Sequence, residues 1–393
     1  MIAPAIPHSR TVRSMGDDLV AAMRNGASAN PVSLRRVAGF EGWSGLDLPR
    51  RVGGADWSAL EMSRLFRECG RRDVEYRDLI GAGHARLIVM AGTRRFDPFL
   101  RSVASGEAFA AIAITEPEAG SDLHALSTVA TPRGNEYRLT GSKQYISRIQ
   151  ESTHFVVVAT TSREGSLPRI TAFLVPRTTP GLSVESMSSM GMATVSWGKV
   201  HLDNVTVPSS SRIGGEGQGL SLFMRHFSYW RTMMAAIAIG SGEAAIDQAA
   251  ARMRTRDAFG GPIGRFTHLQ QALAQHVARL RMAWLLIEQV AGEGETRRWP
   301  VYDAAMAKAE AVEIALDATQ WAMTVFGAEG YHSELGLEKR YRDLAGLRIA
   351  DGTTDVLRGQ VARAFLGERL YQLSLNRPPC EGFERDHQRR RFW

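Results

Sequence analysis

The chain has few of the residues on which common metal and hydrolytic sites depend. It holds two cysteines in 393 residues, Cys69 and Cys380, too few for a disulfide framework or a cysteine metal cluster. The sequence also lacks HExxH, paired CxxC, a GxxxxGK[ST] loop and GxSxG. We therefore expect no metal site, no P-loop nucleotide site and no serine-hydrolase elbow.

Long apolar runs are missing as well. The mean hydropathy is -0.18, and no uncharged stretch approaches the ~20 residues that span a bilayer. The first residues, MIAPAIPHSRTVRSMGDD, become charged too early for a signal peptide. These features predict a cytoplasmic protein without a membrane span.

Lysine is rare, and basic charge is spread thinly. The net charge is +7, yet only Lys143, Lys199, Lys308 and Lys339 are lysines, and the arginines mostly stand beside acids, as in GRRDVEYRD. A nucleic-acid partner usually needs a clustered basic surface, so we do not expect one. The excess charge suits an anionic small molecule or an acidic protein partner.

Hydrophobic periodicity divides the chain into three blocks and a tail. Residues 1–110 read as an all-α domain, 111–217 as a small β-domain, 218–373 as a helical bundle, and 374–393 as a basic tail. Helices, then strands, then helices indicate an α+β fold class and differ from the alternating order of a dinucleotide-binding fold.

The periodicity differs clearly between the blocks. Val12, Met15, Leu19 and Met23 share a helical face, and Ser58 is available as an N-cap for a second helix. Residues 154–159 (HFVVVA) and 170–175 (ITAFLV) are typical strands, which predicts a small antiparallel barrel or sandwich. After residue 218, apolar residues recur every three or four positions, as in a four-helix bundle.

The most specific segment is Thr115-Glu116-Pro117-Glu118-Ala119-Gly120-Ser121-Asp122. A hydroxyl, an acid, a proline and a glycine in one tight turn bring backbone N–H groups and side-chain donors to one concave point. Such a turn can donate hydrogen bonds to a flat, electron-accepting heterocycle or to an oxyanion.

This string resembles the TEPxAGSD signature of the acyl-CoA dehydrogenase family. Segments similar to the family's other motifs follow the expected order: LPRRVGG at 48–54, GSKQYIS at 141–147, RDAFG at 256–260, FGAEGY at 326–331 and DGTTDV at 351–356. The resemblance extends from about residue 45 to residue 367. It implies a helical domain, a β-barrel domain and a four-helix bundle, which is the order that periodicity indicates.

The resemblance implies FAD as the cofactor, between the β-domain and the bundle. The residues that would contact FAD are Thr115, Ser121, Tyr145, Ser147, Arg256, Phe259, Thr324, Gly327, Thr353 and Asp355. Tyr145 and Ser147 would flank the isoalloxazine, while Arg256 and Phe259 would reach the FAD of a neighbouring subunit. A guanidinium suits a diphosphate because its planar fork matches two phosphate oxygens.

The implied reaction is α,β-dehydrogenation of an acyl thioester. A carboxylate removes the α-proton while the β-hydrogen leaves as hydride to flavin N5. The position of the base is Asp351, whose backbone N–H would donate to the thioester carbonyl. The expected substrate-contacting residues are Ser121, Tyr229, Trp230 and Arg231, with the aromatic pair either narrowing the pocket or packing in the core.

Several positions differ from the family pattern. The usual base is glutamate, so Asp351 is retracted by roughly one C–C bond, and a displacement of about 1 Å can cost about a hundredfold in rate. The family's asparagine after the GxKxWIT strand is Arg148. Thr267 replaces a glutamine and Ala328 a glycine. These changes indicate a specialised, biosynthetic branch of the family.

Three interpretations remain open from the sequence. The first is a dehydrogenase for a thioester of coenzyme A or of a carrier protein, passing electrons to an electron-transferring flavoprotein. The second is an oxidase or monooxygenase that uses oxygen, similar to the nitroalkane oxidases, which also use an aspartate. The third is a non-catalytic partner subunit. By the resemblance, we expect a homodimer or homotetramer.

Overall fold

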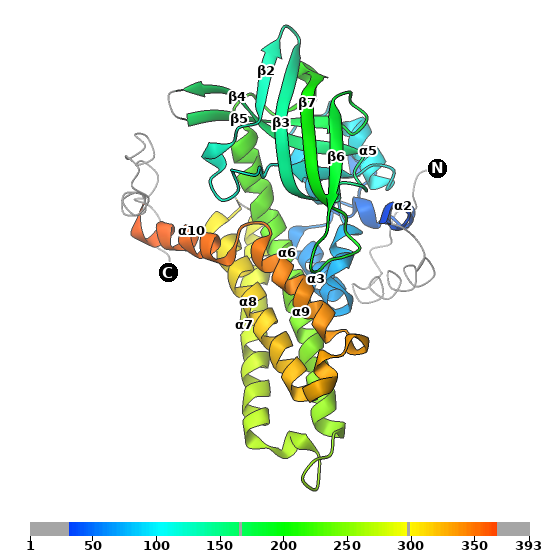
Figure 1. Cartoon of the computed structure of the whole chain (residues 1–393), viewed down its shortest axis with the longest axis vertical. Helices are drawn as coiled ribbons and strands as arrows, with labels where there is room; N and C mark the ends of the chain where they lie inside the picture. The colour runs from blue at the N-terminus through cyan, green and yellow to red at the C-terminus, as the bar shows by residue number, and fades with distance from the viewer. Residues whose placement is uncertain (1–30, 165–166, 297–298, 368–393) are drawn as a thin grey trace.

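The computed structural model describes residues 31–164, 167–296 and 299–367. A sheet lies at one end of an elongated molecule, and long helices extend from it (Figure 1). The predicted helix around Val12–Met23 and the predicted basic tail lie outside the described residues. The first described helices are α2 (Pro31–Phe40), α3 (Ala59–Arg72), α4 (Arg86–Met90) and α5 (Asp97–Ala104).

Helix α3 begins as its sequence predicts. Ser58 caps it, because the Ser58 hydroxyl accepts from the Glu61 backbone N–H at 3.1 Å. The Glu61 carboxylate in turn accepts from the Ser58 backbone N–H at 2.8 Å, which completes a capping box. The predicted N-cap is therefore confirmed.

The middle of the chain forms one sheet of eight strands. The strands are β1 (Ala110–Ala113), β2 (Val129–Arg133), β3 (Glu136–Ser147), β4 (His154–Glu164), β5 (Leu167–Pro176), β6 (Leu182–Met187), β7 (Trp197–Pro208) and β8 (Arg212–Ile213). Their order is β6-β7-β3-β2-β4-β5-β8, with β1 beside β4. The predicted antiparallel arrangement holds for most pairs, but β4 pairs in parallel with both β1 and β2.

Strand β4 is a continuous apolar run because both of its faces are buried. Phe155 and Val157 face the core enclosed by the sheet itself, whereas Val156 and Val158 pack against residues of α5 and α6. A strand that is covered on both faces needs apolar residues at every position, as parallel strands commonly do.

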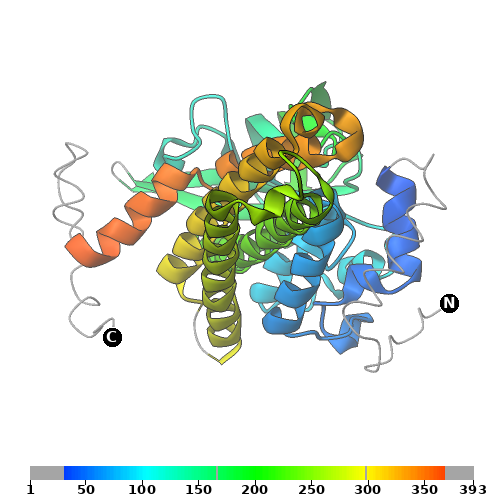
Figure 2. The same ribbon diagram turned by 90° about the horizontal axis from the view of Figure 1, so that it is seen from below.

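The helices of the last block are α6 (Gly219–Thr255), α7 (Thr267–Thr296), α8 (Val301–Phe326), α9 (Leu337–Ile349) and α10 (Thr354–Leu366). Helix α6 runs through the centre, with α3 on one side and α7 and α8 on the other (Figures 1 and 2). Because helices surround it, residues 226–242 of α6 are all buried. Among the described helices, none has the length and apolar character needed to cross a membrane.

Close contact between α3 and α6 depends on glycine. A Cβ at Gly70 would lie 2.0 Å from the Ile237 carbonyl oxygen, and one at Gly240 would lie 1.9 Å from the Arg67 carbonyl oxygen. The N-terminal helical block and the bundle therefore share one core. Leu79 and Ile80, which follow α3, belong to the same buried cluster as Met233 and Met234 in the middle of α6.

Candidate functional site

The loop between α9 and α10 carries Asp351 on an anchored backbone. Lys308 Nζ donates to the carbonyl oxygens of Ala350 and Gly352, both at 2.7 Å. Arg231 Nε donates to the Asp351 carbonyl oxygen at 2.8 Å. Three successive carbonyls of this loop thus accept hydrogen bonds from cations of α6 and α8.

Both anchoring cations are buried. Burial lowers the pKa of Lys308 to about 8, against the opposing effect of Asp351. Burial likewise lowers the pKa of Arg231 to about 10, again opposed by Asp351. Asp351 Oδ2 is itself buried and has no hydrogen-bond partner among the described residues. The loop backbone is therefore fixed, while one oxygen of its carboxylate makes no hydrogen bond within the described part of the chain.

Two residues with strained backbone lie at the end of β3 and directly after it. Tyr145 and Arg148 have positive φ values of 60° and 65°, and the register of β3 against β7 shifts between Lys143 and Ile146. The Tyr145 side chain is 50% exposed and stacks on Trp197, with ring centroids 5.3 Å apart. The two rings form a flat aromatic surface that is partly open to solvent.

The turn at residues 115–122 is fixed to β3 from within. The buried Lys143 Nζ donates to a Glu116 carboxylate oxygen at 2.8 Å, and the Ser127 and Thr128 backbone N–H groups donate to the same carboxylate. Burial alone would raise the pKa of Glu116, but these partners outweigh it and lower the pKa to about 2. Thr115 and Ser121 therefore lie on a rigid turn, half-buried and exposed respectively.

Strained backbone gathers at the predicted site residues. Among the described residues, seven non-glycine residues have a positive φ. Three of them, Tyr145, Phe259 and Asp351, are predicted to contact cofactor or substrate, and Arg148 follows the predicted Ser147. Such conformations cost about 1–3 kcal/mol each and persist mainly at functional sites.

The structure separates the two adjacent aromatics of α6. The Tyr229 hydroxyl donates to the buried Asp47 carboxylate at 2.8 Å, and its ring packs edge-on against Trp299 in the core. Trp230 instead contacts His84, with ring centroids 4.9 Å apart, and lies beneath the Arg148 guanidinium. The structure therefore places Arg231 against the Asp351 backbone and Trp230 beside His84 and Arg148, whereas Tyr229 packs against Asp47 and Trp299.

The start of α10 holds two further predicted residues. Thr353 is the N-cap of α10, because its hydroxyl accepts from the Val356 backbone N–H at 3.3 Å. Asp355 is exposed in the first helical turn. The neighbouring Thr354 hydroxyl is buried without a hydrogen-bond partner among the described residues.

The remaining predicted residues lie far from Asp351, at the opposite end of the bundle. Arg256 and Phe259 belong to the loop after α6, and Phe259 is 90% exposed. Thr324 and Gly327 end α8, beside a groove of about 350 Å³. An ion pair at 2.7 Å between Arg252 and Glu329 joins the last part of α6 to the turn after α8.

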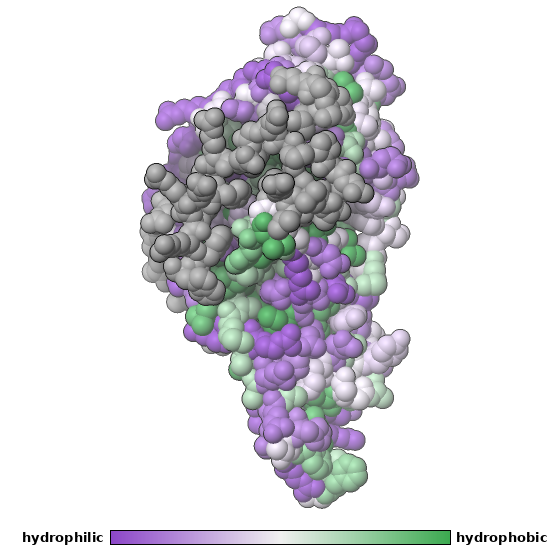
Figure 3. Space-filling model, turned by 90° about the vertical axis from the view of Figure 1, so that its left-hand side faces the viewer, coloured by the Kyte–Doolittle hydropathy of each residue, from purple (hydrophilic) through white to green (hydrophobic). Residues whose placement is uncertain are grey.

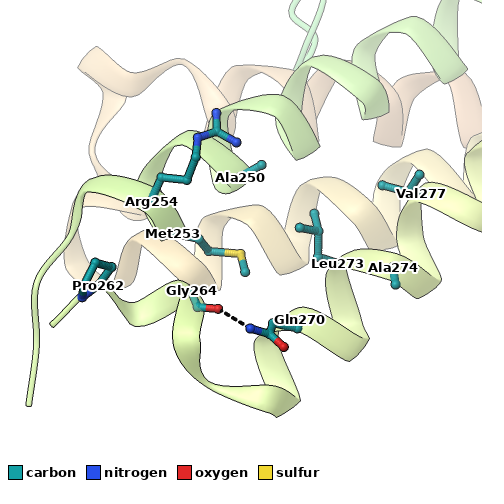
Figure 4. Close-up of a pocket in the computed structure, with 9 residues that line it drawn as sticks. All are labelled: Ala250, Met253, Arg254, Pro262, Gly264, Gln270, Leu273, Ala274 and Val277. Carbon is teal, nitrogen blue, oxygen red and sulfur yellow. Dashed lines mark hydrogen bonds between the residues drawn. The ribbon is translucent and has the colours of Figure 1, made fainter.

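A second groove, of about 600 Å³, lies beside the loop after α6 (Figure 4). Its lining is apolar and comes from Ala250 and Met253 of α6 and from Leu273 and Val277 of α7. Gln270 Nε2 closes one side by donating to the Gly264 carbonyl oxygen at 2.9 Å (Figure 4). Within one chain, this end of the bundle does not join the site around Asp351.

Sequence analysis did not identify Arg77, His84, His226 and Lys308. Each residue is ordinary in its own segment, and they come together only because the two 3-10 turns after α3, at Val74–Asp78 and Gly83–Ala85, pack near α6 and α8. One signal was present for Lys308. It is one of four lysines in the chain and stands among alanines, where a charged residue needs a specific partner.

Comparison with known proteins agrees with this arrangement. Two family models match the chain: the acyl-CoA dehydrogenase middle domain over residues 111–205 and the acyl-CoA dehydrogenase C-terminal domain over residues 217–366. The chain therefore belongs to the acyl-CoA dehydrogenase family. As a member, it is an oxidoreductase that acts on CH–CH bonds, and the cofactor of the family is FAD.

Individual relatives differ in their substrates. The chain is 29% identical to the probable acyl-CoA dehydrogenase YngJ of Bacillus subtilis, over 86% of this chain and 90% of that protein. It is 31% identical to the glutaryl-CoA dehydrogenase of Desulfococcus multivorans, over 69% and 70% of the two chains. The solved structure of the prolyl acyl carrier protein oxidase AnaB superposes with a TM-score of 0.83, at 26% identity, over 91% of this chain and 98% of that one.

Proposed function

We propose that this chain oxidises the Cα–Cβ bond of an acyl thioester and that Asp351 removes the α-proton. The buried, unpartnered Asp351 Oδ2 on an anchored loop supports this assignment above all. A general base must keep a free oxygen within reach of its proton, and a fixed backbone keeps that oxygen in place.

The predicted cofactor residues fit a flavin. Tyr145 and Trp197 offer a flat aromatic surface, with the Ser147 hydroxyl two residues beyond Tyr145. Thr115 and Ser121 would face the same region from the rigid turn, and Thr353 and Asp355 from the start of α10. FAD, when bound there, supplies the acceptor for the β-hydrogen and its two electrons.

Each step that the protein performs would involve a group already held in place. The Cα–H bond breaks, its proton goes to an Asp351 carboxylate oxygen, and the Asp351 backbone N–H donates to the thioester carbonyl. Arg231 and Lys308 would keep both groups in position through the loop carbonyls. The aspartate is shorter than the family's glutamate, so the thioester must lie closer to the loop.

We further propose that the site is completed by a second copy of the chain, in a homodimer or homotetramer. Arg256, Phe259, Thr324 and Gly327 are too far from Asp351 to serve the same FAD within one chain. Exposed apolar side chains on α7 and α10 offer surface for such contacts, namely Val277, Met282, Leu285, Phe365 and Leu366. Figure 3 shows apolar patches among polar ones along the helical part of one side of the molecule.

The central experiment replaces Asp351 and follows the flavin. Asp351→Asn is expected to retain flavin but to lose anaerobic bleaching by acyl thioesters, presented on coenzyme A and on a carrier protein. Asp56→Asn is a matched control, because Asp56 also has a positive φ of 58° but is exposed and lies outside the site. Normal bleaching in the Asp351→Asn variant would remove Asp351 from the mechanism.

The electron acceptor divides two candidate functions. The similarity to AnaB, which is named an oxidase, supports oxygen as an alternative acceptor to an electron-transferring flavoprotein. Rapid reoxidation of the reduced protein in air would identify an oxidase, and slow reoxidation a dehydrogenase. A colourless preparation that binds no added FAD would instead favour the non-catalytic partner subunit. Cytoplasmic localisation remains part of this proposal.

A further inference from the structure

The loop between β6 and β7, residues 188–196, is attached to α9 by two hydrogen bonds. The Met192 backbone N–H donates to Asp343 Oδ1 at 2.6 Å. The Met190 carbonyl oxygen accepts from Arg342 Nη1 at 2.8 Å. Both Arg342 and Asp343 belong to α9, so a loop of the sheet is held by a helix of the C-terminal block.

The contact between this loop and α9 is backbone to backbone. A Cβ at Gly191 would lie 2.6 Å from the carbonyl carbon and the carbonyl oxygen of Arg342. An ordinary contact between two carbon atoms is about 3.5 Å or longer, so a side chain at this position would push the loop away from the helix. The absence of a side chain at Gly191 therefore sets how closely the loop approaches α9.

Glu75 anchors the same loop from a second element. It belongs to the 3-10 turn Val74–Asp78, and its Oε1 accepts from the Thr194 backbone N–H at 2.8 Å. Lys339 of α9 joins the two acids, with Nζ 3.0 Å from Glu75 Oε2 and 2.7 Å from Asp343 Oδ2. Each carboxylate thus uses one oxygen for the loop and the other for the lysine.

Electrostatic attraction holds this cluster of acids and lysine together. Lys339 Nζ also lies 2.9 Å from Asp73 Oδ1, so three acids surround one ammonium. Burial alone would lower the pKa of Lys339, but Asp73, Asp343 and Glu75 outweigh it and raise the pKa. Arg340 adds positive charge near Asp73 and Asp343. Lys339 is therefore charged at neutral pH and joins α9 to the turn after α3.

The loop continues directly into the aromatic surface of the candidate site. Trp197 is the first residue of β7; it pairs with Ser147 of β3 and stacks on Tyr145. The preceding residue, Ser196, accepts through its carbonyl oxygen from the Arg148 backbone N–H at 2.5 Å. A shift of the loop would therefore move Trp197 and the end of β3 with it.

Helix α9 also leads to the proposed base. It ends at Ile349, and Asp343 lies about two helical turns before Asp351. One element thus contacts the loop that leads to the aromatic surface and carries Asp351 just beyond its own end. In the proposed reaction one acyl group loses a proton to Asp351 and a hydride to the flavin, so the two partners must keep a fixed spacing.

We infer that Glu75, Arg342 and Asp343 are positioning residues for this reaction. They hold the 188–196 loop on α9 and thereby fix the spacing between the aromatic surface and Asp351. This inference rests on the proposed function and adds to it residues that act only through the loop.

Gly191→Ala tests the inference without removing a polar group. The new Cβ must retreat by about 1 Å from the Arg342 backbone, from 2.6 Å to an ordinary contact. We expect FAD to bind with altered visible circular dichroism and fluorescence. Bleaching at saturating thioester should slow about a hundredfold, while the half-saturating concentration changes less than about threefold. Gly292→Ala is the control, because a Cβ there meets no atom within 4 Å.

A second pair of variants separates the loop contact from a nearby ion pair. Arg342→Met loses the hydrogen bond to the Met190 carbonyl oxygen and should show the same changes to a smaller degree. Glu338→Gln removes only the acid that pairs with Arg342 Nε at 2.7 Å, and should behave as the wild type. Equal changes in both variants would overturn the inference, because Arg342 would then act through Glu338.

The flavin signals separate this inference from the proposed function. If no thioester bleaches the wild type, the proposed oxidation fails, yet circular dichroism of Gly191→Ala against Gly292→Ala still decides whether the loop positions the flavin. Wild-type flavin signals in Gly191→Ala would overturn the inference. A wild-type bleaching rate despite altered signals would also overturn it, since the spacing would not govern the reaction. If Gly191→Ala does not fold, Arg342→Met against Glu338→Gln gives the same decision.

Discussion

Lys308 tests whether the loop backbone, more than the overall fold, positions Asp351. In Lys308→Met, a side chain of similar length loses both hydrogen bonds to the Ala350 and Gly352 carbonyls. Hydrogen bonds from a charged donor contribute about 1.5–3 kcal/mol each. Against this, the drop in the pKa of Lys308 from 10.5 to about 8 corresponds to about 3 kcal/mol of unfavourable burial. The two effects largely cancel, so the free energy of unfolding should fall by only about 0–3 kcal/mol.

Activity should change much more than stability. Two unsatisfied carbonyls will shift the loop, and a displacement of about 1 Å can reduce the rate about a hundredfold. The assay is single-turnover flavin bleaching under anaerobic conditions, with a denaturant midpoint measured on the same sample. Lys199→Met is the control, because Lys199 forms only a surface ion pair with Glu185 at 3.0 Å. Bleaching at the wild-type rate in Lys308→Met would refute the role of these carbonyl bonds.

The same lysine predicts a rise in stability at alkaline pH. Below pH 8 Lys308 is charged in both the folded and the unfolded state, so its burial cost is fully present. Between pH 8 and 10.5 the unfolded chain binds more protons, and the free energy of unfolding rises with pH. The Lys308→Met variant should lack this component. Parallel pH profiles of the two proteins would contradict the lowered pKa.

Three further predictions concern other buried groups and the distant end of the bundle. Glu116→Gln should lower the free energy of unfolding at pH 7 by about 3–5 kcal/mol, because Lys143 loses its buried partner. The wild type loses stability as pH falls from 4.5 towards 2, and the variant should not show this loss. Thermal midpoints measured across pH would show both effects. His84, with a folded pKa of about 4 against 6.5 unfolded, should make the wild type lose about 2 kcal/mol between pH 7.5 and 5, and a denaturation series should find a shallower slope for His84→Gln. Arg256→Ala should lower the flavin-to-protein ratio after gel filtration, with the exposed Arg281→Ala as control; an unchanged ratio would exclude the contact between subunits.

Much of the fold could be predicted because local patterns decide it. Ser58 caps α3 through hydrogen bonds with Glu61, three residues further along the chain. After residue 218, apolar residues spaced three and four apart predict the helices of the bundle, which the structure has. The parallel neighbours of β4 could not be predicted. Their register joins Ala110 to His154, and period-two alternation does not specify which distant strand pairs with which.

The candidate site was predictable only where motif and chemistry coincide. Asp351 and the turn at Thr115 belong to recognisable strings, whereas Arg77, His84 and Lys308 belong to none. These three residues share only an electrostatic interaction with Asp351, which the packing of distant segments creates, and each alone resembles an ordinary charged or polar residue. The sequence shows that Arg148 replaces the asparagine of the family motif. Its left-handed backbone and its ion pair with Asp78 could not be predicted from the sequence.

Because the loop backbone is anchored, the length of the acidic side chain at position 351 can change independently of the loop. Arg231 and Lys308 hold main-chain oxygens, so their grip does not depend on which side chain stands at position 351. Aspartate and glutamate codons differ only in the third base. A single nucleotide change can therefore lengthen or shorten the catalytic side chain by one methylene while the hydrogen bonds to the loop stay the same. Members of the family can thus adjust the position of the carboxylate to a new acyl group in one mutation.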